Sequence, residues 1–266
     1  MWNNLATLVR YRGLVRSLVA RELKARYRGS VLGFFWSFVN PLLLLSIYSF
    51  VFSTILQNSD VKLQPYALFM FCGLLPWTWF SSSLNEASSA LISGSNLIKK
   101  VLFPAEILPI VSVLANMVHF ALGLLILAAF FVGLRYTPDW ADLIFFPLVV
   151  AIQLIFTTGL VLALSALTVH FRDIRDLLAN LLTFWFFATP IIYRYDAPNV
   201  EPYMWLFKLN PFFHLSVSYQ EILFFRGSFI EGHLTLLVVF GVISIGVFFA
   251  GYWLFDRLRD SFAEMA

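Results

Sequence analysis

The hydrophobic pattern of the chain consists of long apolar runs separated by short polar segments. Six runs approach or exceed the roughly 20 residues that an α-helix needs to cross a bilayer. They cover 31–56, 65–92, 107–134, 143–169, 177–193 and 234–255. The second run is the most polar, because it contains several serines and Glu86. The pattern predicts an all-α integral membrane protein with six transmembrane helices.

The segment before the first run predicts an amphipathic helix over 14–29 that lies at the membrane surface. Its apolar side consists of Leu14, Val15, Leu18, Val19 and Leu23, and its basic side of Arg21, Lys24 and Arg28. Glu22 and Arg26 interrupt the apolar side, but their i,i+4 spacing allows an ion pair. Two interpretations stay open for this helix: a basic anchor on anionic lipid head groups, or a contact with protein. Gly29 would let the backbone turn into the first span.

The segment 194–233 is too apolar for an ordinary loop. It contains two short apolar stretches separated by Asn210-Pro211, and proline there forces a turn. We expect two short re-entrant helices at the outer face, before the last span. A seventh span is the alternative, but Lys208 and Glu221 disfavour it, since a charge at the bilayer centre costs roughly 2.5–3.5 kcal/mol.

The distribution of basic residues predicts the orientation. With the N-terminus in the cytoplasm, thirteen of the eighteen lysines and arginines fall in the inner segments. We therefore expect one transmembrane domain over 1–266, with both termini cytoplasmic. It would comprise a cytoplasmic interfacial segment (1–30), six spans (31–255) and a cytoplasmic tail (256–266).

Composition agrees with a membrane protein and excludes several classes of function. Hydrophobic residues make up 60% of the chain and charged residues 12%, and the mean hydropathy is +0.82, whereas a soluble chain has roughly 25% charged residues. The single cysteine and the four scattered histidines have no metal-binding spacing, so no metal site and no catalytic residue are predicted. No Gly-Lys dipeptide is present, which excludes a phosphate-binding P-loop.

Several motifs together resemble one family. They are RELKARYRGSVLGFFW at 21–36 followed by Asn40-Pro41, KKVLFP at 99–104 with EILP at 106–109, FRDI at 171–174, TPIIY at 189–193 and LNP at 209–211. The combination resembles the permease subunits of type-2 ATP-binding-cassette exporters for O-antigen, capsule and teichoic-acid polymers. The resemblance extends over most of the chain.

This resemblance implies a permease of the bacterial inner membrane that works as a homodimer with two separate ATPase subunits. This chain would bind no cofactor, because ATP and magnesium would sit on the ATPase, and no nucleic-acid partner is expected. The cargo would be a lipid-linked, O-antigen-like polysaccharide or a teichoic-acid-like polymer. In that family a short helix between the second and third spans docks on the ATPase, flanked by the N-terminal helix. The coupling residues would then be Asn96, Leu97, Ile98, Lys99, Lys100, Val101, Phe103, Glu22 and Arg26.

A pore for a glycan would also suit the aromatic content, because sugars present C–H faces to rings and hydroxyls to polar groups. The candidate pore residues are Phe35, Trp36, Tyr48, Phe184, Trp185, Phe187 and Tyr193. The candidate outer gate consists of Trp205, Asn210, Pro211 and Phe212. Aromatic residues are also common against lipid, which is the alternative for each of them.

Two other functions remain open at this stage. One is a type-2 exporter of drugs or small lipids. The other is a membrane-embedded transferase that acts on glycan lipids, which would need carboxylates or a histidine gathered at one membrane face. The inner acidic residues are few, which disfavours the transferase.

Overall fold

The computed structural model describes residues 11–55, 61–95, 97, 104–198, 200–225 and 229–262, and over these residues the chain forms helices and no strands. Five helical segments within them are long and apolar enough to cross a membrane. They are Gly33–Phe52, Tyr66–Ser93, Ile107–Gly133, Trp140–His170 and Leu234–Ser261. The predicted all-α membrane fold is therefore confirmed.

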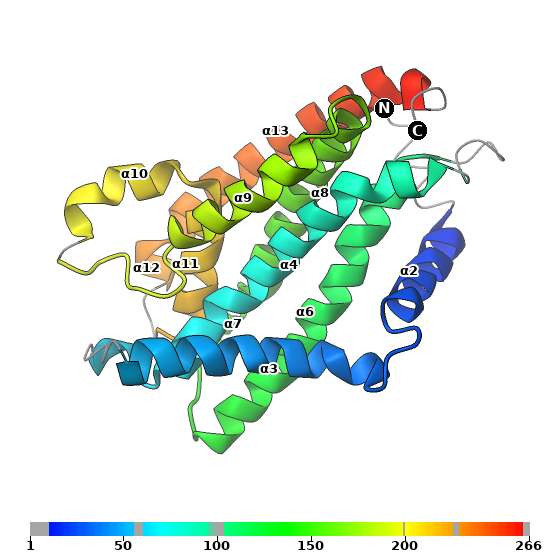
Figure 1. The fold of residues 1–266 in the computed structure, drawn as a ribbon. Helices are drawn as coiled ribbons and strands as arrows, with labels where there is room; N and C mark the ends of the chain where they lie inside the picture. Colours follow the sequence, from blue (N-terminus) through cyan, green and yellow to red (C-terminus); the bar gives the residue numbers. More distant parts are fainter. Residues whose placement is uncertain are drawn as a thin grey trace.

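The core is a bundle of four long helices: α4 (Tyr66–Ser93), α6 (Ile107–Gly133), α8 (Phe146–His170) and α13 (Leu234–Leu258). Helix α4 packs between α6 and α8, and α13 packs along α8 (Figure 1). Because it has protein on most sides, α4 is the most buried of the spans. Aromatic side chains fill the centre; the rings of Phe80 and Phe212, for example, lie 4.7 Å apart.

The bundle has two ends, which we name by their turns. At the α8–α9 end, a short turn leads from α8 into α9 (Ile174–Phe187). At the opposite, α6–α7 end lie the short helices η3 (Val61–Leu63) and α7 (Trp140–Leu143). Helix α13 continues at the α8–α9 end into the 3-10 turn η5 (Arg259–Ser261) (Figure 1).

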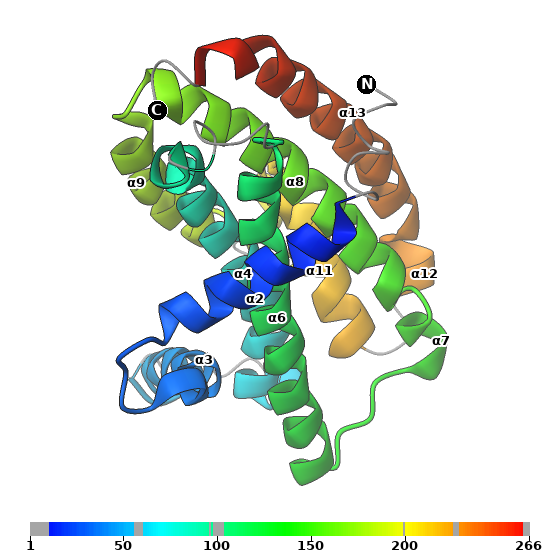
Figure 2. The ribbon, with the colours of Figure 1, turned by 90° about the vertical axis from the view of Figure 1, so that its right-hand side faces the viewer.

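The N-terminal part of the chain packs on the side of this bundle. Helix α2 (Arg12–Arg26) lies against α6, where Leu18 is buried with Ile107 and Val111 (Figure 2). The predicted apolar stripe of this helix thus faces protein. Gly29, with φ of +80°, provides the turn that follows the helix.

The first span begins with the 3-10 turn η1 (Gly33–Phe35), runs through α3 (Trp36–Ser49) and ends in a π-helical turn, η2 (Phe50–Ile55). Only 11% of its apolar window is buried, since it touches the bundle mainly at α4 and α6. Figure 1 shows that it crosses the bundle obliquely, and most of its apolar surface has no protein neighbour within the described chain.

The two short helices predicted before the last span are present. They are α10 (Met204–Leu209) and α11 (Pro211–Leu223), accompanied by η4 (Glu201–Tyr203) and α12 (Phe229–Gly232). Neither α10 nor α11 is long enough to cross a bilayer. Helix α11 begins at Pro211, where the Asn210 side chain accepts a hydrogen bond from the Phe212 N–H at 3.0 Å.

The predicted fifth span, 177–193, differs from the observed helix. Helix α9 starts three residues earlier and ends at Phe187 after 14 residues, which is shorter than a typical span. Pro190 explains the early end, because proline lacks an N–H and restricts the residue before it. The prediction of a helix over 177–193 used hydropathy alone and did not take the effect of Pro190 into account.

A close glycine contact holds α8 against α13. A Cβ added to Gly251 would overlap the carbonyl oxygen of Gly159, and one added to Gly159 would lie 2.6 Å from the Phe248 Cα. Small residues at such a crossing let two helix backbones approach, as is common between membrane helices.

We therefore expect Gly251→Ala to destabilise the purified protein by roughly 1–3 kcal/mol, the usual cost of overpacking. Thermal unfolding in lipid nanodiscs measures the effect. Gly246→Ala, on the same helix but with no atom within 4 Å of the added Cβ, is the control and should be neutral. Equal unfolding temperatures for the two variants would contradict the close contact.

Candidate functional site

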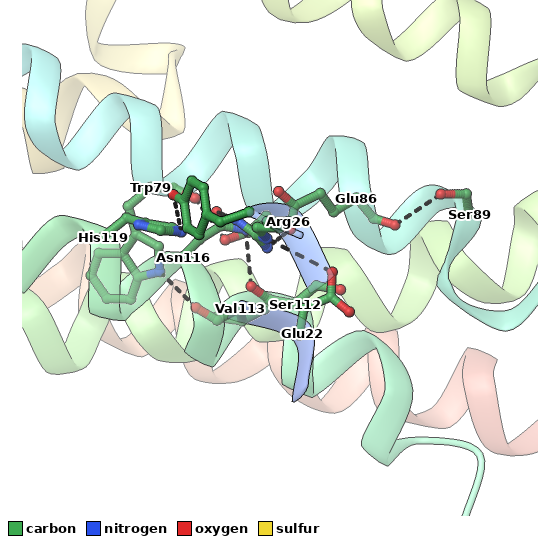
Figure 3. Close-up of polar contacts among 11 residues, drawn as sticks. Glu22, Arg26, Trp79, Glu86, Ser89, Ser112, Val113, Asn116 and His119 are labelled. Atoms are coloured by element: carbon green, nitrogen blue, oxygen red, sulfur yellow. Dashed lines mark hydrogen bonds and ion pairs between the residues drawn. The ribbon is translucent and has the colours of Figure 1, made fainter. Parts of the chain in front are cut away.

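Three polar side chains from three helices meet near the α8–α9 end of the bundle (Figure 3). The Arg26 guanidinium at the end of α2 donates to the Asn116 Oδ1 of α6 at 2.9 Å, and also contacts Glu86 Oε2 of α4. The Asn116 amide donates to the same Glu86 oxygen at 2.7 Å and to the Ser112 carbonyl at 2.9 Å. We call Arg26, Glu86 and Asn116 the polar clamp.

The clamp lies within the membrane-spanning part of the bundle. Asn116 is nine residues from the start of α6, which corresponds to about 14 Å along the helix axis. Charged groups at that depth are costly unless they are paired. The three side chains satisfy one another, and this explains why an arginine stands on the apolar side of α2, where it turns into the bundle.

A second set of polar contacts continues from the clamp toward α3. The Tyr27 hydroxyl lies 3.4 Å from His119 Nε2 and accepts a hydrogen bond from Ser37 Oγ at 2.8 Å. Trp36 Nε1 donates to Ser30 Oγ at 2.9 Å. Together with the clamp, Tyr27, Trp36, Ser37 and His119 line a cavity of about 670 Å³ between α2, α3, α4 and α6.

The arrangement can transmit movement rather than perform catalysis. Helix α2 is fixed to α6 by apolar contacts along its length and to α4 and α6 by the clamp at its end. Removing one partner of a buried ion pair typically costs 3–5 kcal/mol, so α2 and the two spans should move together when α2 is displaced.

The predicted coupling residues fall mostly outside the description. Asn96, Ile98, Lys99, Lys100, Val101 and Phe103 lie outside the described residues. Leu97 is described and packs against a small cluster that includes Leu91 and Phe262. Glu22 forms the predicted i,i+4 pair with Arg26, with 3.7 Å between Oε1 and Nε. The Arg26 side chain is only 18% exposed, so we assign it to the clamp inside the bundle and not to an outer docking surface.

The predicted pore residues divide into exposed and packed groups. Phe35 in η1 and both Phe184 and Phe187 in α9 are exposed, and Trp36 lines the cavity beside the clamp. Tyr48 packs on Phe186 with ring centroids 5.7 Å apart. Tyr193 donates to the Phe187 carbonyl at 2.9 Å, so its hydroxyl closes the end of α9.

Trp185 differs from its predicted role in a pore. Its ring packs between Trp77 and Phe80, and its Nε1 donates to the Asn210 Oδ1 at 2.6 Å. These contacts join α9, α4 and the start of α11. Hydropathy could not separate such a packed tryptophan from an exposed one, because both positions favour the same residue.

The predicted outer gate also contains packed residues. Asn210 caps α11 and donates to the Ala188 carbonyl at 3.0 Å, and Phe212 is fully buried beneath Trp77 and Phe80. Pro211 begins α11. Only Trp205 among these four is largely exposed. Asn210 and Phe212 therefore hold the two short helices in place.

Sequence reasoning missed Asn116 and did not connect Glu86 with Arg26. A signal was present, because Glu86 is the single charged residue of the second apolar run, Asn116 is a polar residue in the third run, and Arg26 interrupts the apolar side of the N-terminal helix. The spacing along the chain does not say which isolated polar residues meet, and only the packing of α2 on α6 brings these three together.

We expect Arg26→Ala to destabilise the protein by roughly 1–3 kcal/mol, less than the 3–5 kcal/mol of a fully buried pair because the Glu86 side chain is 34% exposed. Adding Glu86→Gln should restore part of the loss, since the unpaired charge is removed. Thermal unfolding is the measurement. Arg21→Ala, an exposed arginine of the same helix, is the control; an equal effect of both arginine variants would exclude the clamp.

Known proteins are similar to this chain over nearly its whole length. Residues 13–224 match the ABC-2 type transporter family. The chain is 40% identical over 258 residues to the O-antigen export system permease protein RfbA of Myxococcus xanthus, covering 97% of this chain and 96% of that protein. It is 32% identical over 245 residues to an RfbA of Klebsiella pneumoniae, with 92% of each chain covered.

A more distant similarity is to the polysialic acid transport protein KpsM of Escherichia coli, at 22% identity over 90% of this chain and 92% of that protein. The resemblance to polysaccharide-export permeases that the motifs indicated is thus confirmed. The chain belongs to the ABC-2 type transporter family.

Proposed function

We propose that this chain is the membrane permease of an ATP-driven exporter that moves a lipid-linked, O-antigen-like polysaccharide across the bacterial inner membrane. The polar clamp is the observation that carries the proposal. A surface helix joined to two spans through a buried arginine gives a separate motor protein a part that it can move. The names of the relatives support a polysaccharide as the cargo.

The working unit in this proposal is a homodimer. The first span and α9 both carry an apolar face that has no protein neighbour within the described chain, with Phe35 of η1 at 70% and Phe184 of α9 at 72% exposure. Two such faces per subunit support a pore between two copies, with aromatic rings available to a sliding sugar chain. Six spans per subunit, with α9 as the shortest, put both termini on the cytoplasmic side, as the basic residues favour.

Two ATP-binding-cassette ATPase subunits would dock on the cytoplasmic face. In this proposal 96–103 inserts into the ATPase, and α2 receives the movement through Glu22 and the neighbouring clamp. ATP and magnesium would be bound by the ATPase, so this chain needs no cofactor. The residues that follow this segment support the proposal. Pro104 lies three residues before the start of α6, and α6 is the helix on which α2 packs.

Reversing two charges on this loop tests the docking proposal. Lys99→Glu combined with Lys100→Glu should lower copurification with the ATPase at least severalfold. The two lysines would give this side of the contact a positive charge, and the variant reverses it. Copurification from membranes is the measurement. Lys62→Glu combined with Lys208→Glu reverses two exposed lysines at the α6–α7 end and should leave copurification intact. Unchanged copurification and unchanged export in the first variant would remove the loop from the interface.

Two tryptophans test the pore. Trp36→Ala should lower the amount of polymer at the cell surface while ATP hydrolysis by the purified complex is retained, and Trp36→Phe should keep much of the export, because a ring face remains. Trp185→Ala should reduce both activities together, because this half-buried ring packs on Trp77 and Phe80 and its indole binds Asn210, so its loss weakens the contacts between α9, α4 and α11. If Trp36→Ala lowered export and ATP hydrolysis in equal proportion, Trp36 would be a packing residue and not a pore residue.

A further inference from the structure

A second polar cavity lies at the α6–α7 end, far from the clamp along the bundle. Its volume is about 480 Å³, and it is bounded by the segment before α4, Tyr136 after α6, residues 194–196 and the end of α11. None of its residues was among the predicted pore or gate residues. In the proposed orientation it opens on the outer side of the membrane.

A buried carboxyl group with an unsatisfied oxygen faces this cavity. Glu221 is 2% exposed and lines the cavity wall. Its Oε1 accepts a hydrogen bond from the Tyr195 hydroxyl at 2.8 Å, whereas its Oε2 has no hydrogen-bond partner among the described residues. Buried polar atoms in proteins nearly always have a partner, and leaving one without costs free energy. A donor that reaches this oxygen from the cavity that Glu221 lines would satisfy it.

The electrostatics of Glu221 agree with a missing donor. Burial, with smaller contributions from Asp142 and Asp196, raises the pKa of Glu221 to about 7, although the Tyr195 hydrogen bond acts in the other direction. Burial, and then the negative charge of Glu221, also raise the pKa of Tyr195, so its hydroxyl stays protonated and donates. A further donor at Oε2 would stabilise the carboxylate form.

The other walls combine aromatic rings with a closed ion pair. The Tyr136 and Phe224 rings stack nearly parallel with centroids 5.6 Å apart, and the Phe225 ring meets Phe224 edge-on at 5.1 Å. Arg194 Nε donates to Asp196 Oδ1 at 2.7 Å, and a second contact joins Nη2 to Oδ2. The cavity thus presents planar polar groups beside apolar ring surfaces.

These features favour a neutral polyol over an ion. The lining carries charges of both signs, because Arg194 is paired with Asp196 and the remaining Lys62 and Glu221 are of opposite sign, so neither a cation nor an anion is favoured. A sugar unit is uncharged and suits this lining. Its hydroxyls can donate to Glu221 Oε2 and accept from neighbouring donors, and its C–H face can cover a ring. We propose that this cavity binds one sugar unit of the exported polymer on the outer face, with Glu221 and Tyr195 as its polar recognition residues. The proposal rests on the proposed polysaccharide export.

Such a site would hold the polymer after it leaves the pore. A chain that is pushed outward by ATP-driven steps can also slide back, and weak binding of a sugar unit outside the membrane opposes that return. A cavity of this size accommodates a single ring more readily than an extended stretch of polymer. Binding of one unit at a time would leave the chain free to advance.

The test uses the purified permease–ATPase complex in lipid nanodiscs. The probe is the oligosaccharide that mild acid releases from the surface polymer of the bacterium that carries this chain, and its binding is followed by saturation-transfer NMR and calorimetry. Glu221→Gln and Tyr195→Phe should each weaken binding roughly three- to tenfold, because each loses a charge-assisted or neutral hydrogen bond. Glu201→Gln, an exposed glutamate at the same end, is the matched control and should bind like the wild type.

Several outcomes would overturn the proposal. They are an absence of wild-type binding, equal binding by the Glu221→Gln and Glu201→Gln variants, or competition by millimolar inorganic phosphate or calcium. If Glu221→Gln fails to fold, Gln64→Ala replaces it, because the Gln64 side chain is exposed and lines the cavity. The Gln64→Ala variant should also bind the oligosaccharide more weakly. Unchanged binding by this variant would count against the site. A deletion strain that keeps its surface polymer would refute the proposed export, whereas loss of polymer together with variant-insensitive binding would refute this inference alone.

Discussion

Polar groups that lie in a lipid-facing bundle have no water to bind, so each must find its partner within the protein. The backbone meets this requirement by forming helices, and the side chains meet it by pairing between helices. Gln153 donates to the Pro76 carbonyl at 2.8 Å, and the indole of Trp79 donates to the Val113 carbonyl at 3.1 Å. The polar clamp is the charged example of the same requirement. These contacts fix particular helix pairs, and close packing such as that of Gly251 on Gly159 fixes others.

The clamp fixes the N-terminal helix to the bundle. A basic amphipathic helix that only anchors the protein at the membrane surface could shift without disturbing the spans. Helix α2 instead buries Leu18 against α6 and ends in an arginine held by two other helices. A displacement of α2 toward or away from the bundle must therefore either break a paired charge or move α4 and α6. The second course keeps the charges paired, and it couples α2 to the central helix of the bundle.

At the α6–α7 end, other polar side chains also pair between helices. The Asn210 side chain ties Trp185 of α9, the residues after α9 and the start of α11 together through four hydrogen bonds, so the two short helices are fixed at their junction. Glu221, farther along α11, keeps an oxygen free beside an open cavity. One end of the molecule thus holds a closed set of polar contacts that can carry movement, and the other holds an open set suited to a hydroxylated ligand.

Hydropathy and turn residues determined the membrane class, the position of most spans, the short-helix pair split at Asn210-Pro211 and the interfacial helix, because these depend on local composition and on the backbone limits of proline and glycine. The family could also be recognised from motifs. The tertiary structure alone decided which aromatic residues are packed, as with Trp185 and Phe212, since lipid and protein interiors select the same side chains. It also decided that Arg26, Glu86 and Asn116 meet, because partners 30 to 90 residues apart are chosen by helix packing and not by spacing along the chain.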